Sequence, residues 1–236
     1  MPDASRLRGK ERWLDATDRI SDAYGLVLLL VLATVVLSSL LPETGWGAFL
    51  AVVACNLTAL VALTTSRAPM PRVKRALGVL IATSFLAALS ALLDVTWMLA
   101  LAYTASVFLL AGAMATVLIS VVTVQHVDSR TLLGAVSVYT SMGILFTFAF
   151  KAIDRFQPGP FFESETAEHT GDFVFFSYTT LTTTGYGNLV PAEQPGKLFA
   201  LLEMLTGQIF LVTLVAGLVT LWRPPRRVGR NRGGNE

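Results

Sequence analysis

A short polar run, Thr183-Thr184-Gly185-Tyr186-Gly187, has the residue types needed to bind a dehydrated cation through backbone oxygens. This TTGYG run lies between apolar segments long enough to cross a membrane, where threonine and glycine are not the residues that a span presents to lipid. Glycine tolerates positive φ, so Gly185 and Gly187 can turn successive carbonyls toward one side. Four such strands around one axis would form stacked rings of oxygen that replace the water around a cation.

The TTGYG run resembles the selectivity filter of potassium channels, which commonly reads TVGYG. The resemblance extends from about Gly171 to Leu221 and takes in a pore helix, the filter and an inner helix. It implies that permeant potassium ions bind at four consecutive residues, Thr183, Thr184, Gly185 and Tyr186. It also implies a homotetramer, because a single strand cannot encircle an ion.

The chain departs from this family at two positions. Thr184 replaces the usual valine, and its side chain should point toward the pore helix, so we expect a packing effect without loss of selectivity. Asn188 replaces a common aspartate, which removes one carboxylate per subunit from the outer mouth. The hydrogen-bond clamp that ties that aspartate to the pore helix, here at Thr179 and Thr180, is therefore in doubt, and we expect altered filter stability.

Two features are expected to support the filter. The Tyr186 ring should pack against an aromatic residue of the pore helix, Phe175 or Phe176. Glu203 lies inside an apolar segment, where a carboxylate costs about 2.5–3.5 kcal/mol on insertion scales, so it should have a partner. We predict that Glu203 faces the back of the filter and bonds to pore-helix hydroxyls or filter amides.

The last apolar segment should line the inner cavity and contribute to gating. Gly207 lies where inner helices of this family often have a hinge, but glycine in a membrane helix equally marks close packing. Four residues at helical spacing are expected to include the cavity lining, namely Gln208, Leu211, Val212 and Val215.

The composition is that of an integral membrane protein. Of the 236 residues, 53% are hydrophobic and 14% are charged, whereas soluble domains have about 25% charged residues. The single cysteine, Cys55, excludes an intrachain disulfide framework, and we expect it to be a small core or lipid-facing residue. Six apolar segments approach the length of a spanning helix, and they are approximately Tyr24–Leu41, Trp46–Thr65, Ala76–Leu93, Trp97–Val124, Leu132–Phe150 and Leu198–Trp222.

We therefore predict an all-α membrane protein with six transmembrane helices, assembled as a tetramer. The segment Gly171–Leu181 is too short to span and should be a re-entrant pore helix between the fifth and sixth helices. The expected domains are a four-helix part at 24–124 and a pore domain at 125–222. They are flanked by a cytoplasmic segment at 1–23, either a surface helix or a solvated tail, and a basic cytoplasmic tail at 223–236.

Basic residues decide the predicted orientation. If both termini are cytoplasmic, in the plasma (inner) membrane, only three of the 18 lysines and arginines lie outside, namely Lys151, Arg155 and Lys197. An excess of basic residues on the cytoplasmic side is the usual arrangement in membrane proteins. A voltage sensor needs repeated basic residues in the membrane field, and Trp97–Val124 contains no charged residue. Steep voltage gating is therefore not expected, and the similarity of the first four helices to voltage-gated channels is one of topology.

The predicted function is potassium-selective passive transport through a filter lined with carbonyl groups. One alternative is a weakly selective cation channel, which Thr184 and Asn188 leave open, and another is a non-conducting sensor or regulatory subunit with a pore-like fold. No nucleophile–base set, metal cluster or phosphate loop supports an enzyme. The expected partners are potassium ions, the lipid bilayer and other copies of the chain, without a cofactor or nucleic acid.

Overall fold

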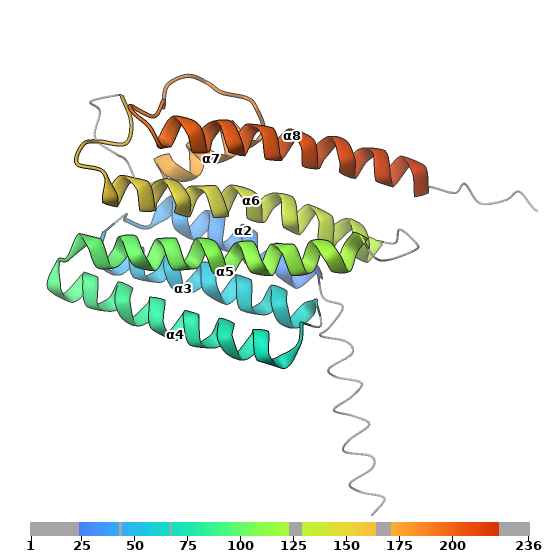
Figure 1. Ribbon diagram of the computed structural model, residues 1–236, viewed down its shortest axis with the longest axis horizontal. Helices are drawn as coiled ribbons and strands as arrows, with labels where there is room; N and C mark the ends of the chain where they lie inside the picture. The colour runs from blue at the N-terminus through green and yellow to red at the C-terminus, as the bar shows by residue number, and fades with distance from the viewer. Residues whose placement is uncertain (1–23, 43, 67, 123–128, 164–170, 222–236) are drawn as a thin grey trace, which may run out of the picture.

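The computed structural model describes residues 24–42, 44–66, 68–122, 129–163 and 171–221. The segments predicted at 1–23 and 223–236 lie outside these ranges. Figure 1 shows the described helices, which are α2 (Tyr24–Leu40), α3 (Gly45–Thr65), α4 (Met70–Leu93), α5 (Thr96–Val122), α6 (Ser129–Phe156), α7 (Asp172–Leu181) and α8 (Gly196–Leu221).

The long helices lie side by side in layers (Figure 1). α8 and the short α7 form one face, α6 lies beneath them, and α4 forms the opposite face. α6 packs against α2, α5, α7 and α8, and α5 packs against α3 and α4. α6 therefore connects the part that carries the TTGYG run to the other helices.

Within the described ranges, five helices are long and apolar enough to cross a membrane, and they are Gly45–Thr65, Met70–Leu93, Thr96–Val121, Leu132–Phe156 and Gly196–Gly217. These correspond to five of the six predicted spans. The remaining one, α2, is apolar but has only 17 residues, which gives a helix about 26 Å long. That is somewhat less than the roughly 30 Å hydrocarbon core of a bilayer, so the prediction of six spans is supported for five of them.

α4 begins earlier than predicted. The expected segment starts at Ala76, but the helix begins at Met70 with Pro71 in its first turn. Proline is tolerated there, because the first N–H groups of a helix have no partner within the helix. Three basic residues thereby become part of α4, namely Arg72, Lys74 and Arg75.

Buried polar side chains connect the first helices. The hydroxyls of Thr34 on α2 and Thr58 on α3 are 3.0 Å apart, and Asn56 Nδ2 donates to Thr83 Oγ1 on α4 over 2.7 Å. Such bonds join helices where lipid offers no polar partner. Cys55 is 1% exposed among the same helices, so of its two predicted environments the core is the one observed.

The short helix α7 starts against the end of α2. Its N-cap, Gly171, has φ of 92°, and a Cβ at this position would lie 2.9 Å from the Ser39 carbonyl oxygen. Glycine therefore satisfies both the left-handed backbone and the close approach. With 10 residues, α7 is about 15 Å long, roughly half of a membrane span.

Candidate functional site

The backbone of the TTGYG run alternates in φ. Thr183, Gly185 and Gly187 have φ of 56°, 49° and 80°, whereas Thr184 and Tyr186 between them do not have positive φ. Alternating right- and left-handed residues turn successive peptide groups to the same side. The positive φ predicted for the two glycines is confirmed. Positive φ at Thr183 was not predicted, and it is uncommon outside glycine.

The amides at the start of the run bond back to the C-terminal end of α7. Thr183 N donates to Thr180 O over 2.9 Å, and the amides of Thr184 and Gly185 both donate to Thr179 O, over 2.8 and 3.2 Å. A carbonyl points opposite to the N–H of its own trans peptide group. The carbonyls of Thr182, Thr183 and Thr184 therefore point away from α7, and all residues from 182 to 188 are exposed in the single chain.

The residues predicted to clamp the outer mouth act differently. Thr179 and Thr180 contact the run through their backbone carbonyls, as described above, and the Thr179 hydroxyl bonds to Phe176 O within α7. Among the described residues, the side chain of Asn188 makes no hydrogen bond and is exposed. The described residues thus contain no hydrogen bond between Asn188 and Thr179 or Thr180, as the loss of the aspartate led us to expect. The effect of this loss on filter stability stays a prediction.

Tyr186 and Phe175 stack, with ring centroids 5.6 Å apart and an interplanar angle of 17°. Phe176, the other candidate, instead lies in a buried cluster with Phe150 and Phe161. The two neighbouring aromatics of α7 therefore face different partners, since Phe175 contacts the run and Phe176 packs α7 onto α6.

Glu203 is 0% exposed and contacts α7. Its Oε1 atom lies 2.5 Å from Ser177 Oγ, and the same hydroxyl lies 2.7 Å from the Gly143 carbonyl oxygen of α6. Its Oε2 atom has no hydrogen-bond partner among the described residues. The predicted contact between Glu203 and a hydroxyl of the helix before the filter is present. The sequence did not indicate that Ser177 and Gly143 would take part, because nothing distinguishes them from other small residues.

Gly207 packs directly against the end of α7. A Cβ at Gly207 would lie 2.6 Å from Leu181 O, and α8 continues through this position as one helix. Of the two readings left open, close packing is present here. One residue further along, Gln208 Nε2 donates to Thr183 Oγ1 over 3.1 Å, so α8 also contacts the inner end of the run.

Most of α8 is uncovered in the single chain. Among the α8 residues whose burial is described, four are buried, namely Gly196, Ala200, Glu203 and Gly207. The predicted cavity residues Leu211, Val212 and Val215 are exposed, and their assignment to the cavity stays a prediction.

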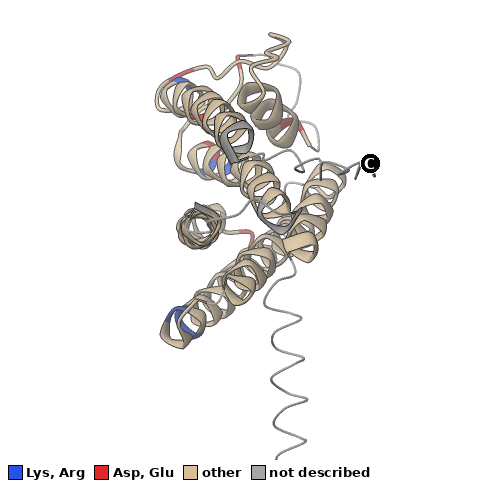
Figure 2. Cartoon of the chain, turned by 90° about the vertical axis from the view of Figure 1, so that its right-hand side faces the viewer, with Lys and Arg blue, Asp and Glu red and all other residues tan. Residues whose placement is uncertain are grey.

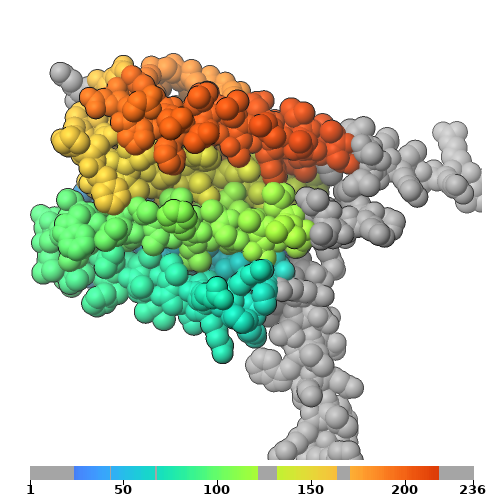
Figure 3. Space-filling view, in the orientation of Figure 1, coloured from blue at the N-terminus to red at the C-terminus, as the bar shows by residue number. Residues whose placement is uncertain are grey.

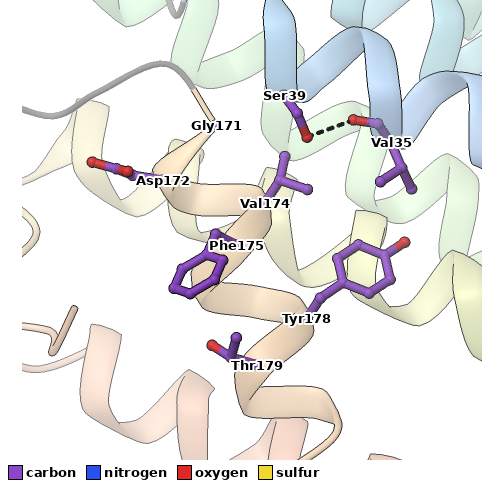
Figure 4. A pocket seen from close by; sticks show the side chains of 8 residues that line it. All are labelled: Val35, Ser39, Gly171, Asp172, Val174, Phe175, Tyr178 and Thr179. Carbon is purple, nitrogen blue, oxygen red and sulfur yellow. Dashed lines mark hydrogen bonds between the residues drawn. The ribbon is translucent and has the colours of Figure 1, made fainter. Parts of the chain in front are cut away.

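A groove of about 500 Å³ separates α2 from α7. Figure 4 shows that Val35 and Ser39 of α2 face Val174 and Tyr178 of α7 across it. Phe175, whose ring stacks on Tyr186, also lines this groove.

Loops on either side of the run are joined to each other. Glu163 N donates to Val190 O over 2.9 Å, and Ala192 N donates to Phe161 O over 2.8 Å. Lys197 Nζ and Glu163 Oε1 form an exposed ion pair at 3.1 Å. The residues that follow the run are thereby held to the loop after α6.

Comparison with known proteins identifies the domain that contains this site. Residues 136–223 match the family described as "Ion channel". A relative from Oryza sativa subsp. japonica, "Two pore potassium channel c", is 35% identical over 83 residues, which is 35% of this chain and 17% of that protein. No solved structure matches. The C-terminal part of the chain, which contains α7, the TTGYG run and α8, therefore matches an ion channel domain, and the chain is similar over 83 residues to part of a potassium channel.

Proposed function

We propose that the protein is a potassium-selective channel in which four copies each contribute one TTGYG run to a common filter. The observation that carries this proposal is the alternation of φ at Thr183, Gly185 and Gly187, together with amides that bond back to α7. Carbonyls that point away from α7 are available to replace the water around an ion. α7 then acts as a re-entrant pore helix whose negative C-terminal end favours a cation.

Exposure supports the assembly of four copies. The whole run is exposed in one copy, and so are large apolar residues along α8, such as Leu205, Ile209 and Val212. Neighbouring copies around a fourfold axis would cover α8 and bring the runs together. Potassium ions are the permeant ligand of the proposed site, and no cofactor is needed to move ions down their gradient.

Selectivity for potassium over sodium is the finer part of the proposal. A thousandfold preference needs roughly 4 kcal/mol, which the carbonyl geometry would have to supply. The side chain of Asn188 makes no hydrogen bond among the described residues, which favours a second candidate, a weakly selective cation channel. Reversal potentials in mixed sodium and potassium solutions distinguish the two.

Gating and orientation also belong to the proposal. α5 contains no charged residue, and the basic residues of α4 are confined to its beginning. We therefore propose a channel without steep voltage dependence. Basic residues favour an orientation in which the first turns of α4 face the cytoplasm, in the plasma (inner) membrane.

The proposal is tested by potassium flux from purified protein in liposomes, with barium as a blocker. Gly187→Ala should abolish flux, because φ of 80° is strained for any residue with a Cβ. Gly78→Ala is the matched control, since Gly78 is exposed on α4 and a Cβ there meets nothing within 4 Å.

Barium-sensitive flux in the wild type and in Gly78→Ala, with loss in Gly187→Ala, is the expected result. Absence of flux in a tetrameric, folded wild-type protein would favour the non-conducting alternative. A monomer in lipid would overturn the shared filter.

A further inference from the structure

A second groove lies between α4 and α5, with α3 at its floor, at the end of the bundle where α4 begins. Its volume is about 400 Å³. α4 and α5 lie next to each other on the face shown in Figure 3. Figure 2 looks onto this end of the molecule and shows Lys and Arg as a blue segment at the end of the lowest helix. The groove belongs to the four-helix part and not to the candidate filter.

Two arginines stand at one end of this groove. Arg72 and Arg75 both line it, and they are three residues apart, so they lie on the same side of α4. Lys74, between them in sequence, does not line it. Within the described part of the chain, no carboxylate pairs with either arginine. Two guanidinium groups with fork-like donors suit a phosphate group.

The rest of the groove is apolar. On α5 it is lined by small residues, including Gly112 and Ala113. The Thr116 hydroxyl, also in the lining, donates to Gly112 O within the helix over 2.8 Å, so it presents mainly its methyl group. A Cβ at Gly112 would meet nothing within 4 Å. The surface next to the arginines is thus a shallow apolar trough.

We infer that this groove binds an anionic phospholipid of the cytoplasmic leaflet. The phosphate lies between Arg72 and Arg75, and one acyl chain lies along α5 over Gly112 and Ala113. The charge of the arginines matches the headgroup, and the trough matches the chain. Basic pockets between helices on the cytoplasmic side of membrane proteins bind such headgroups. The inference rests on the proposed orientation and not on potassium conduction.

The test measures lipid bound to the purified full chain by native mass spectrometry, with phosphatidylglycerol and phosphatidylcholine as probes. Phosphatidylglycerol should bind more tightly than phosphatidylcholine. Arg72→Gln and Arg75→Gln should each weaken its binding by about fivefold. Lys74→Gln removes the same charge one position away and should leave it within twofold of the wild type. Equal losses in Lys74→Gln and Arg75→Gln would mean diffuse surface attraction and would overturn the site.

A second variant separates the lipid from a free anion. Gly112→Leu fills the trough without changing charge, and it is compatible with the helix because the position is exposed and open. It should weaken phosphatidylglycerol binding and leave the competition by glycerol phosphate unchanged. If Gly112→Leu has no effect and glycerol phosphate competes fully, the groove takes a headgroup anion only, and the lipid inference is wrong. Helix content and melting temperature confirm that each variant is folded.

Discussion

The Ser177 hydroxyl has one hydrogen and two oxygen neighbours, Gly143 O at 2.7 Å and Glu203 Oε1 at 2.5 Å. It can donate to only one of them at a time. If Ser177 donates to the Gly143 carbonyl, the short contact with Glu203 requires a hydrogen on the carboxyl group. If Glu203 is neutral, its carboxyl group can donate to Ser177 while Ser177 donates to Gly143 O. The two bonds together would join α6, α7 and α8 at a single point.

This arrangement predicts different results for two substitutions. Glu203→Gln keeps the volume and supplies an amide donor to Ser177, so it should change the free energy of unfolding by less than about 1 kcal/mol. Glu203→Ala removes the bond and leaves a cavity, with an expected cost of about 2–4 kcal/mol. Thermal unfolding in detergent and potassium flux measure the two effects. A glutamine variant as unstable as the alanine variant would show that the charged carboxylate is required.

Phe175 and Phe176 provide a second contrast at this scale. Phe175→Ala removes the ring stacked on Tyr186, a contact worth about 0.5–1.5 kcal/mol beyond its buried area. We expect reduced flux or faster loss of conduction with little change in melting temperature. Phe176→Ala empties a buried cluster and should cost about 3–5 kcal/mol of folding stability. The same two measurements, flux and melting, compare them, and equal melting losses would contradict the separate roles.

At the scale of elements, α7 and α8 approach closely at Gly207. A Cβ there would lie 2.6 Å from Leu181 O, so Gly207→Ala should push α8 away from α7 and cost about 1–3 kcal/mol. Gly217→Ala is the control on the same helix, because a Cβ at Gly217 meets nothing within 4 Å. Melting temperature and flux should fall in the first variant and stay near wild type in the second. Altered gating with unchanged stability in Gly207→Ala would instead favour the hinge.

Local residue chemistry predicted much of the candidate site. Gly185 and Gly187 have the positive φ that glycine allows, and the Tyr186 ring contacts one of the two aromatics named for it. Positive φ at Thr183 was missed, because it depends on amide bonds to carbonyls of α7 and not on the type of residue. Ser177 was missed because α7 is apolar on several sides, so its sequence does not indicate which side meets Glu203.

The limits of the helices were predicted less well. Pro71 ends a helix when it lies inside one but is accommodated in a first turn, and only the folded chain distinguishes the two cases. As a result, α4 contains three basic residues that precede the predicted start of the helix at Ala76. α2 was predicted to span, but it is one of the shorter apolar helices at 17 residues.

For the whole molecule, the four-helix part has little charge to respond to voltage. Moving one charge through 100 mV yields about 2.3 kcal/mol, or roughly a fiftyfold change in an equilibrium. The interior of α5 offers no such charge. We expect steady-state potassium conductance in planar bilayers to change by less than tenfold when the voltage is varied from about −100 to about +100 mV. A steeper dependence would require a charge that moves elsewhere in the protein.

The exposure of the TTGYG run in a single copy has a consequence for mixed populations of the chain. If four strands share one ion pathway, a single defective strand abolishes conduction by the whole assembly, although its three neighbours are intact. Cells that produce a normal and a damaged version together would then lose far more conduction than the damaged fraction alone suggests, because intact assemblies become rare as the fourth power of the intact share. A substitution of Gly185 or Gly187 would therefore have a dominant effect when it is produced together with the normal chain.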